Sequence, residues 1–276
     1  MQLEGRVIVV TGGGSGIGAA MCRRFAAEGP EVIVVADLDG DAAAKVAEEV
    51  RSATGDTVVI QHRAVDVSEE SQLDALVART REAHGRVDLF CGNAGIGTGM
   101  GVEAPDEVWE RIWRVNVMAH VYAARALLPT WLEAGEGHLL ITASAAGLLT
   151  NLGDAPYSST KHAAVGLAEW LSVTYGDRGL HVSCLCPQGV RTPLLFGAAT
   201  GADASAELST LSTDVVKAQR ILEPEEVADV VVDGLGDERF LILPHPEVER
   251  YEQARAGDRE RWLSSMRRLQ AGLTGG

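Results

Sequence analysis

Short runs of apolar, β-branched residues alternate along the chain with longer segments of helical pattern. The longer segments are rich in Ala, Glu, Arg and Leu, and the clearest are Gly16–Glu28, Gly40–Arg51, Glu69–His84 and Pro105–Leu132. Strands that are apolar throughout and are separated by helices are typical of a parallel sheet covered on both faces. The predicted strands are Arg6–Val10, Val32–Ala36, Val58–Gln61, Val87–Cys91, His138–Thr142, His181–Cys186 and Phe240–Leu243.

Right-handed crossovers between parallel strands predict an α/β fold of Rossmann type, with a doubly wound sheet of about seven strands. No linker or repeat interrupts the pattern, so residues 1–276 are interpreted as one domain. The weakly patterned segment of about 194–220 is expected to be a substrate loop, because so long a loop in a compact domain is usually functional or partly disordered. The tail of about 246–272 predicts a surface helix that lays apolar side chains on the body or on a partner subunit.

Composition excludes several classes of protein. The formal net charge of −15, from 39 acidic and 24 basic residues, leaves no basic stripe for nucleic acid. No apolar stretch approaches the ~20 residues of a membrane span, and the N-terminus lacks a signal-peptide pattern, so a cytoplasmic location is expected. No metal site is predicted either, because the four cysteines form no CxxC pair and are interpreted as small buried hydrophobes: Cys22, Cys91, Cys184 and Cys186.

A glycine-rich segment follows directly on the first strand and opens the first helix. It reads Thr11-Gly12-Gly13-Gly14-Ser15-Gly16-Ile17-Gly18. Glycines allow close approach of the backbone to a ligand, and a helix N-terminus offers unpaired N–H groups to a pyrophosphate. A flexible turn has the same composition, but the strand before and the helix after favour dinucleotide binding. The expected cofactor contacts here are Gly12, Gly14, Ser15, Gly16 and Ile17.

Asp37 stands at the end of the second strand, 19 residues after Gly18. A carboxylate at this place accepts hydrogen bonds from the adenosine ribose and repels a 2′-phosphate, and Leu38 after it supplies no cation for that phosphate. The sequence therefore favours NAD over NADP, the alternative being a solvated loop acid. Asp66 and Val67, at the end of the third strand, are expected to contact the adenine, unless Asp66 caps the helix that starts near Ser68.

Tyr157 and Lys161 lie four residues apart in a helical pattern and therefore on one helix face. A phenol has a pKa of ~10, but an ammonium ~4 Å away contributes about 4 kcal/mol at an effective dielectric constant of ~20. That energy corresponds to about three pKa units, so the pair predicts a phenol able to exchange a proton near neutral pH. The spacing alone occurs often by chance.

Two further polar residues support this chemistry. Ser144 lies 13 residues before Tyr157, just past a strand, where the ligand crevice of such sheets is found. Asn116 interrupts the long segment Pro105–Leu132, and a structural water or a local kink is expected there, because Asn is disfavoured in the middle of a helix.

Together these residues resemble the short-chain dehydrogenase/reductase family, in its single-domain, NAD-preferring branch. The resemblance runs from about residue 3 to residue 243. Two positions depart from the family pattern: Gly92 stands where an Asn often precedes Asn93, and Gln188 replaces a usual glycine. The matching residues are the glycine loop, Asn93-Ala94-Gly95, Asn116, Ser144, Tyr157, Lys161 and Pro187–Thr192.

The resemblance implies a role for each of these residues. Tyr157 is the general base in alcohol oxidation and the general acid in ketone reduction, while Lys161 lowers its pKa and holds the nicotinamide ribose. Ser144 binds the substrate oxygen, and Asn116 positions a water that links Lys161 to solvent. The resemblance also implies a homotetramer or homodimer. The other residues implied to contact the cofactor are Asn93, Ala94, Gly95, Pro187, Gly189, Val190 and Thr192.

The implied substrate cleft lies between the segment after Ser144, the loop after Thr192 and the C-terminus. It offers no obvious Arg or Lys to bind a carboxylate or phosphate, which predicts a small apolar secondary alcohol or ketone as partner. The alternative interpretation is that several apolar residues of this cleft belong to the hydrophobic core and do not contact a substrate. The residues expected to contact the substrate are Ser144, Ala146, Leu149, Leu152, Tyr157, Leu194, Leu195 and Phe196.

Three other functions fit the pattern less well. A 3-oxoacyl thioester reductase prefers NADPH and a basic surface for an acidic carrier. A non-catalytic NAD sensor or scaffold of the same fold would be expected to lose Tyr157 or Lys161, and both are present. A sugar epimerase of the family's extended branch needs a larger C-terminal domain than 276 residues allow. The leading prediction is therefore hydride transfer between NAD(H) and a hydrophobic alcohol or ketone.

Overall fold

The computed structural model describes residues 1–196 and 220–274. Within these residues seven parallel strands form one sheet, in the order β3-β2-β1-β4-β5-β6-β7. The order reverses between β1 and β4, and ligands of such sheets bind where this reversal opens a crevice. The predicted sheet is confirmed, with strands β1 (Val7–Thr11), β2 (Val32–Asp37), β3 (Val59–Ala64), β4 (Leu89–Gly92), β5 (Gly137–Thr142), β6 (Leu180–Leu185) and β7 (Leu241–Ile242).

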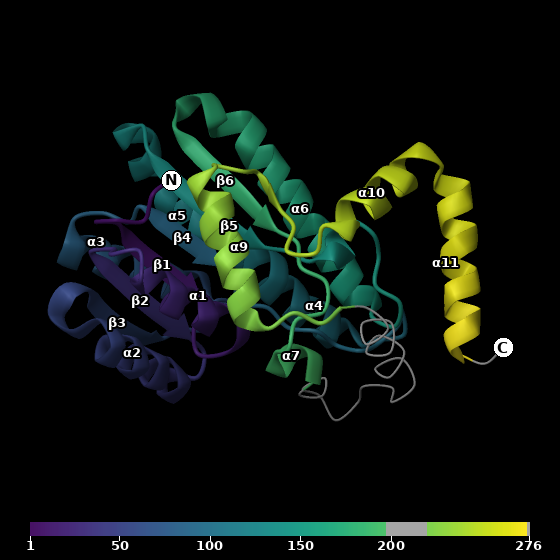
Figure 1. The fold of residues 1–276 in the computed structure, drawn as a ribbon, viewed down its shortest axis with the longest axis horizontal. Helices are drawn as coiled ribbons and strands as arrows, with labels where there is room; N and C mark the ends of the chain where they lie inside the picture. The colour runs from purple at the N-terminus through teal and green to yellow at the C-terminus, as the bar shows by residue number, and fades with distance from the viewer. Residues whose placement is uncertain (197–219, 275–276) are drawn as a thin grey trace.

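Helices cover both faces of the sheet (Figure 1). Helices α1, α2 and α9 pack on one face, and α3, α5 and α6 pack on the other. The helices are α1 (Gly16–Ala26), α2 (Gly40–Thr54), α3 (Glu70–His84), α4 (Asp106–Trp113), α5 (Ala119–Ala134), α6 (Ala155–Tyr175), α7 (Pro193–Phe196), α9 (Pro224–Gly236), α10 (Glu247–Gly257) and α11 (Arg259–Thr274). Short 3-10 turns occur at Gly55–Thr57, Ala145–Gly147 and Gly176–Arg178.

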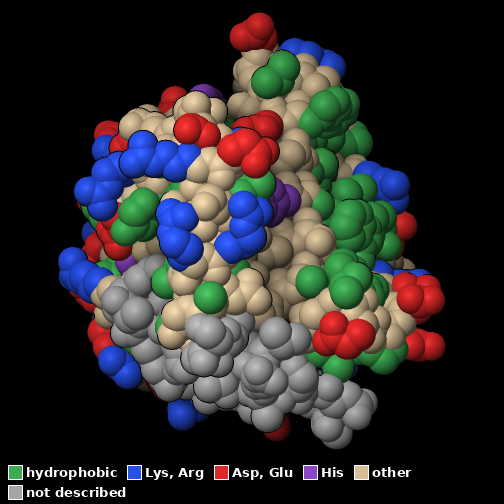
Figure 2. Space-filling model, turned by 90° about the vertical axis from the view of Figure 1, so that its right-hand side faces the viewer, with side chains coloured by type: hydrophobic (Ala, Val, Ile, Leu, Met, Phe, Trp, Pro, Cys, Tyr) green, Lys and Arg blue, Asp and Glu red, His purple; other side chains and the backbone are tan. Residues whose placement is uncertain are grey.

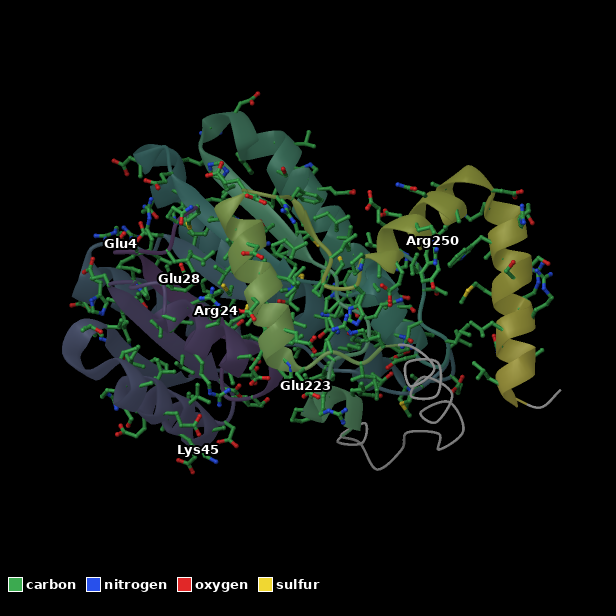
Figure 3. The ribbon with its side chains drawn as sticks, viewed as in Figure 1. Glu4, Arg24, Glu28, Lys45, Glu223 and Arg250 are labelled. Atoms are coloured by element: carbon green, nitrogen blue, oxygen red, sulfur yellow. The ribbon has the colours of Figure 1, made fainter. Side chains whose placement is uncertain are left out.

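Strand β1 shows why the inner strands are mostly apolar, whereas the edge strand β3 carries Gln61, His62 and Arg63. Ile8 and Val10 point toward α1 and α9, whereas Val7 and Val9 point toward the helices of the opposite face. Every residue of β1 is buried, so no position is left for a polar side chain in contact with water. At the surface Arg24 of α1, labelled in Figure 3, forms an ion pair with Asp229 of α9 at 2.7 Å.

The predicted helix Pro105–Leu132 is divided in the structure. Helix α4 ends at Trp113, a π-helical turn covers Arg114–Met118, and α5 begins at Ala119. Asn116 lies inside this turn, so the local distortion expected there is confirmed. A π-turn adds one residue to a helical turn and often occurs at a functional site.

The C-terminal tail forms two helices where the sequence predicted one. Helix α10 leads away from the sheet, and α11 runs back beside the body as a separate arm (Figure 1). Asp258 separates them, because its carboxylate accepts a hydrogen bond from the N–H of Arg261 at 2.9 Å and so caps a new helix. In the described ranges, no helix combines the length and the apolar character needed to cross a membrane.

Candidate active site

A cavity of about 910 Å³ extends from the glycine loop to the C-terminal helices. Of the predicted site residues, Gly14, Asn116 and Leu152 do not line it, and the side chain of Phe196 lies outside the described part, as does most of the predicted substrate loop. The predicted residues that line it are Gly12, Ser15, Gly16, Ile17, Asp37, Leu38, Asp66, Val67, Asn93, Ala94, Gly95, Ser144, Ala146, Leu149, Tyr157, Lys161, Pro187, Gly189, Val190, Thr192, Leu194 and Leu195.

The glycine loop is packed so closely that several of its positions exclude a side chain. Gly12 and Gly16 have positive φ values of 63° and 51°, which favour glycine. A Cβ atom on Gly18 would lie 2.0 Å from the carbonyl oxygen of Gly12. The Asn93 amide donates hydrogen bonds to the carbonyls of Thr11 and Gly12, at 3.1 and 3.3 Å, and joins the end of β4 to the loop.

Asp37 holds the glycine loop from the end of β2. Its carboxylate accepts hydrogen bonds from the backbone N–H of Gly14 at 2.9 Å and of Asp39 at 3.0 Å. A Cβ atom on Gly14 would lie 3.0 Å from this carboxylate and 2.9 Å from Ala42, so Gly14 is required for packing rather than as a cofactor contact. Leu38 is exposed beside it and lines the cavity.

Asp66 does not cap helix α3. The helix begins at Glu70, with Glu69 as its N-cap, and Asp66 instead accepts hydrogen bonds from the N–H and hydroxyl of Ser68, at 2.9 and 2.7 Å. Because Asp66 and Val67 line the cavity below the end of β3, they remain available for an adenine contact.

Gly92 owes its lack of a side chain to the neighbouring histidine. A Cβ atom on Gly92 would lie 2.6 Å from Nδ1 of His120, which projects from α5 and is 1% exposed. The imidazole ring therefore occupies space beside the backbone where the family pattern often has an Asn side chain. This packing gives a physical reason for the departure seen in the sequence.

Ser144, Tyr157 and Lys161 meet at the middle of the cavity. Ser144 follows β5, while Tyr157 and Lys161 lie in the first turns of α6. The Lys161 ammonium is buried and donates a hydrogen bond to the carbonyl of Thr142 at 2.9 Å. It lies 5.5 Å from the centre of the Tyr157 ring.

Burial changes the acidity of both titratable groups. It raises the pKa of Tyr157 to about 12, although a hydrogen bond with Ser144 lowers this pKa in part. Burial also lowers the pKa of Lys161 to about 8. Burial therefore outweighs any lowering of the phenol pKa in this structure, since both groups lose water and the ammonium binds Thr142; the implied lowering by Lys161 stays a prediction.

Asn116 is fully buried and connects two parts of the site. Its carbonyl oxygen accepts from the N–H of Ile96 at 2.9 Å, and its amide donates to the carbonyl of Ile96 at 2.9 Å and to the hydroxyl of Thr160 at 3.2 Å. The side chain therefore fixes the loop after β4 against α6. Its implied role in positioning a water stays a prediction.

A histidine supports the segment that follows β6. The N–H of Gln188 donates to Nδ1 of His245 at 3.2 Å, and Nε2 of the same ring donates to the carbonyl of Arg220 at 3.2 Å. Burial lowers the pKa of His245, which favours the neutral ring that this pair of hydrogen bonds requires. His245 thus acts on the cavity wall through Gln188.

The far end of the cavity is mainly apolar, with Ser265 of α11 among its lining residues. Arg111 of α4 also lines the cavity, so the expectation that no Arg would line it is wrong. Leu149, Leu194 and Leu195 line it as predicted. Helices α10 and α11 form a wall of the cavity, which agrees with the implied place of the C-terminus at the substrate cleft. The apolar residues of this wall, which the sequence did not single out as substrate contacts, are Tyr251, Trp262, Met266 and Leu269. Side chains of α11 point toward the body in Figure 3. Among the described residues no group of His, Cys, Asp and Glu side chains is arranged to hold a metal ion.

Comparison with known proteins agrees with this geometry. The model of the short chain dehydrogenase family matches residues 6–201. A 1-deoxy-11-beta-hydroxypentalenate dehydrogenase of Streptomyces exfoliatus is 33% identical over 251 residues, which cover 90% of this chain and 86% of the relative.

Two solved structures extend the comparison. A short chain dehydrogenase/reductase from Burkholderia phymatum, in complex with NAD, is 31% identical, with a TM-score of 0.83 over 94% of this chain and 96% of its own. A short-chain dehydrogenase from Sphingobium yanoikuyae, in complex with NADPH, is 25% identical, with a TM-score of 0.77 over 94% and 95%. The chain belongs to the short-chain dehydrogenase/reductase family and is an oxidoreductase that acts on CH–OH groups.

Proposed function

We propose that this enzyme interconverts a hydrophobic secondary alcohol and its ketone, with NAD(H) as the hydride carrier, and that the substrate is bulkier than the small alcohol expected from the sequence, because α10 and α11 extend the cavity. The observation that carries the proposal is the continuity of the cavity. One space is lined by the glycine loop at one end, by Ser144, Tyr157 and Lys161 in the middle, and by the apolar face of α10 and α11 at the other.

The residues at the first end fit a nicotinamide dinucleotide. Side chains are sterically excluded at Gly12 and Gly16, where Cβ atoms would lie 2.9 Å from Ala94 and Thr192, so the backbone is open to a pyrophosphate at the N-terminus of α1. Asp37 would hold the adenosine ribose and Val190 and Thr192 the carboxamide end. When bound, the cofactor supplies the atom that accepts or donates hydride.

Tyr157 would move the proton of the reaction. Because burial keeps its pKa at about 12, the phenol is protonated at neutral pH and ready to protonate the oxygen of a ketone. Ser144 would hold that oxygen and stabilise the charge that develops on it. Alcohol oxidation requires the phenolate, so we expect oxidation to accelerate as the pH rises above neutrality.

Lys161 would act through its position. Its Nζ atom lies near the Tyr157 ring and is fixed by the carbonyl of Thr142, so it is placed to hold a ribose hydroxyl. With a pKa of about 8, it loses its charge in mildly alkaline solution. Asn116 would hold α6 and the loop after β4 at a fixed distance while Tyr157 exchanges its proton with the substrate.

The choice of NAD over NADP rests on Asp37 and Leu38. The Asp37 carboxylate, besides holding the loop, would repel a 2′-phosphate, and Leu38 is 66% exposed with no cation to offer. Fluorescence titration is expected to give tighter binding of NADH than of NADPH. Asp37→Ser should narrow this difference, and equal affinities in the unmodified enzyme would contradict the proposal.

The substrate class is tested by a screen of NADH absorbance. Secondary alcohols of aromatic, terpenoid, steroid and aliphatic type are offered with NAD, and the corresponding ketones with NADH. The apolar wall predicts that polycyclic terpenoid or steroid alcohols react with higher kcat/KM than short aliphatic alcohols. Highest activity on small or charged alcohols would contradict the substrate assignment.

We also propose that the enzyme is a homotetramer or homodimer. Helices α4 and α6 expose large apolar side chains, with Trp113 at 43%, Trp170 at 56% and Val173 at 87%. Hydrophobic side chains also gather along one side of the face drawn in Figure 2. Exposed apolar surface of this kind is typical of an interface, and sedimentation that shows only monomer would reject the assembly.

A further inference from the structure

Asp154 is a buried carboxylate with an unusually complete set of hydrogen-bond donors. It is the N-cap of α6 and is 5% exposed. Oδ1 accepts from the N–H of Tyr157 at 2.9 Å and from the hydroxyl of Thr98 at 2.7 Å. Oδ2 accepts from the N–H groups of Thr98 and Gly99, both at 2.7 Å.

These contacts exceed what a helix cap requires. Capping needs one acceptor for an N–H in the first turn of the helix, and the bond to Tyr157 supplies it. The other three bonds reach a segment more than fifty residues earlier in the chain. Two carboxylate oxygens accept about four hydrogen bonds in all, so Asp154 has little capacity left to bind a substrate directly.

The earlier segment, residues 95–99, passes over the reacting groups. Cβ atoms built on Gly95 and Gly97 would lie 3.4 Å from Nζ of Lys161 and 3.9 Å from the Tyr157 ring. Asn116 binds this segment at Ile96, and Asp154 binds it at Thr98 and Gly99. The segment is therefore attached at both ends to elements that carry the proposed catalytic groups.

We propose that Asp154 is a positioning residue, which fixes the Tyr157 phenol and the segment 95–99 as one rigid wall of the reaction site. The proposal rests on the function assigned to Tyr157 above. The four hydrogen bonds that the Asp154 carboxylate accepts are called the clamp from here on. A displacement of about 1 Å between reacting groups costs roughly 100-fold in rate, so the clamp can control turnover without touching the substrate. The glycine loop, which makes more of the expected cofactor contacts than any other segment, takes no part in the clamp, and Gly95 is tied to Asn116 through Ile96, so cofactor affinity is expected to change far less than kcat.

Asp154→Ser is the substitution that separates the two roles of this residue. Serine retains an oxygen that caps α6 at Tyr157 but is too short to hold Thr98 and Gly99. We expect kcat on a steroid or terpenoid alcohol to fall by about ten- to 100-fold, with NADH affinity and helical content unchanged. A kcat equal to that of the unmodified enzyme, or an equal loss of NADH affinity, would overturn the proposal.

Thr98 offers a matched pair of variants. Thr98→Val removes the hydroxyl that donates to Asp154 and accepts from the N–H of Met100 at 3.2 Å, whereas Thr98→Ser retains it. We expect kcat to fall several-fold in the valine variant and to stay near the original value in the serine variant, because one of the clamp's four bonds is lost. Equal rates in the two variants would show that the hydroxyl contributes nothing.

The pH profile separates the clamp from general loosening of the fold. The Tyr157 phenol faces Lys161 on its own helix, Cys186 after β6, Ser144 after β5 and Asp154. Burial is the main cause of its raised pKa, and the Asp154 carboxylate raises the pKa further. Asp154→Ser should therefore shift the midpoint of alcohol oxidation to lower pH. A lower kcat with an unshifted midpoint would indicate a structural role alone and contradict the proposal.

Hydrogen exchange tests the clamp without a substrate. The N–H groups of Thr98 and Gly99 should exchange much faster in Asp154→Ser than in the unmodified enzyme, while those of α1 keep their rates. Unchanged exchange at both residues would overturn the clamp. Tyr157→Phe separates the two hypotheses: if that variant retains turnover the proposed function fails, and if it is inactive while Asp154→Ser is fully active only the clamp fails.

Discussion

The two ends of the cavity are built in opposite ways. At the cofactor end the glycine loop presents its backbone directly, with glycines that exclude side chains at Gly12 and Gly16, and residues that follow β2, β3, β4 and β6 complete the surface. At the substrate end the surface consists of side chains from the segment after β5 and from α7, α10 and α11, and none of the described side chains of α11 is fully buried.

This difference separates chemistry from specificity. A backbone surface supported by buried strands tolerates few substitutions, because an added Cβ atom meets closely packed neighbouring atoms. An apolar face on a helix that stands apart from the core can change its side chains at little cost to folding. The cofactor end is therefore expected to be rigid in sequence and shape, and the substrate end to set which alcohol reacts.

The largest effect is expected where the two ends meet. Tyr157→Phe removes the proton donor and acceptor but keeps the ring, so turnover should fall by about 10²- to 10⁴-fold. NADH affinity, measured by fluorescence titration, should change little because the cofactor end is intact. Tyr122→Phe on α5, which lies outside the cavity lining, is the matched control and should retain full turnover.

A methyl group tests the rigidity of the cofactor end. In Gly18→Ala the new Cβ atom would lie 2.0 Å from the Gly12 carbonyl, so the loop must shift. We expect a loss of about 1–3 kcal/mol in the free energy of unfolding and at least about tenfold weaker NADH binding. Gly166→Ala in α6, which meets no atom within 4 Å, should be neutral or stabilising. An equal free energy of unfolding in urea for Gly18→Ala and Gly166→Ala would show that the cofactor end is no more rigid than an exposed helix.

The substrate end should respond in KM alone. Trp262→Ala removes the largest apolar side chain of the α11 wall, and the expected result is a rise in KM for a polycyclic alcohol of about tenfold. NADH affinity should not change. Leu263→Ala, on the next residue of α11 and outside the cavity lining, is the control. A similar loss in both variants would show that the wall acts only through folding.

Acid should weaken the packing beneath the cofactor end. Burial lowers the pKa of His120 to about 3, against about 6.5 in an unfolded chain. Below pH 6.5 the unfolded chain takes up a proton that the folded chain refuses, so stability falls as the pH falls toward 3 and is unaffected above 6.5. The expected cost from His120 is about 1.4 kcal/mol at pH 5.5.

Urea unfolding at pH 7.5 and 5.5 measures this loss. In His120→Leu the loss of unfolding free energy between pH 7.5 and 5.5 should be smaller, because His120 no longer contributes to it. The contribution of His138, whose pKa burial also lowers to about 3, should remain. An identical pH dependence in the variant and the unmodified enzyme would show that His120 does not titrate as its burial requires.

Much of the fold could be predicted because its signals are local. Each strand except the edge strand β3 is mainly a run of apolar residues, and the structure moves the ends of the predicted strands by only a few positions, as at β4, predicted as Val87–Cys91 and observed as Leu89–Gly92. The division of Pro105–Leu132 was less visible. A π-turn adds one residue without interrupting the apolar pattern, so only the mid-helix Asn116 indicated it.

In the site too, residues close together in the sequence were predicted and contacts between distant segments were not. Most expected cofactor residues line the cavity, because a glycine loop and a helical spacing of four depend on neighbours in the chain. Asp154 was missed, since its partners Thr98 and Gly99 are distant in sequence and an acidic residue before a helix is read as an ordinary cap. Leu152 was wrongly expected to line the cavity, because an apolar residue in a loop does not reveal which way it points.

The sequence alone determined the parallel sheet, the glycine loop and the pairing of Tyr157 with Lys161 on one helix face. Each depends on steric and periodic constraints that act within a few residues. Only the tertiary structure decided which side chains of α10 and α11 line the cavity, that Asp154 joins Tyr157 to a remote segment, and that the phenol pKa rises. These outcomes depend on burial and on contacts between distant segments, which no local spacing encodes.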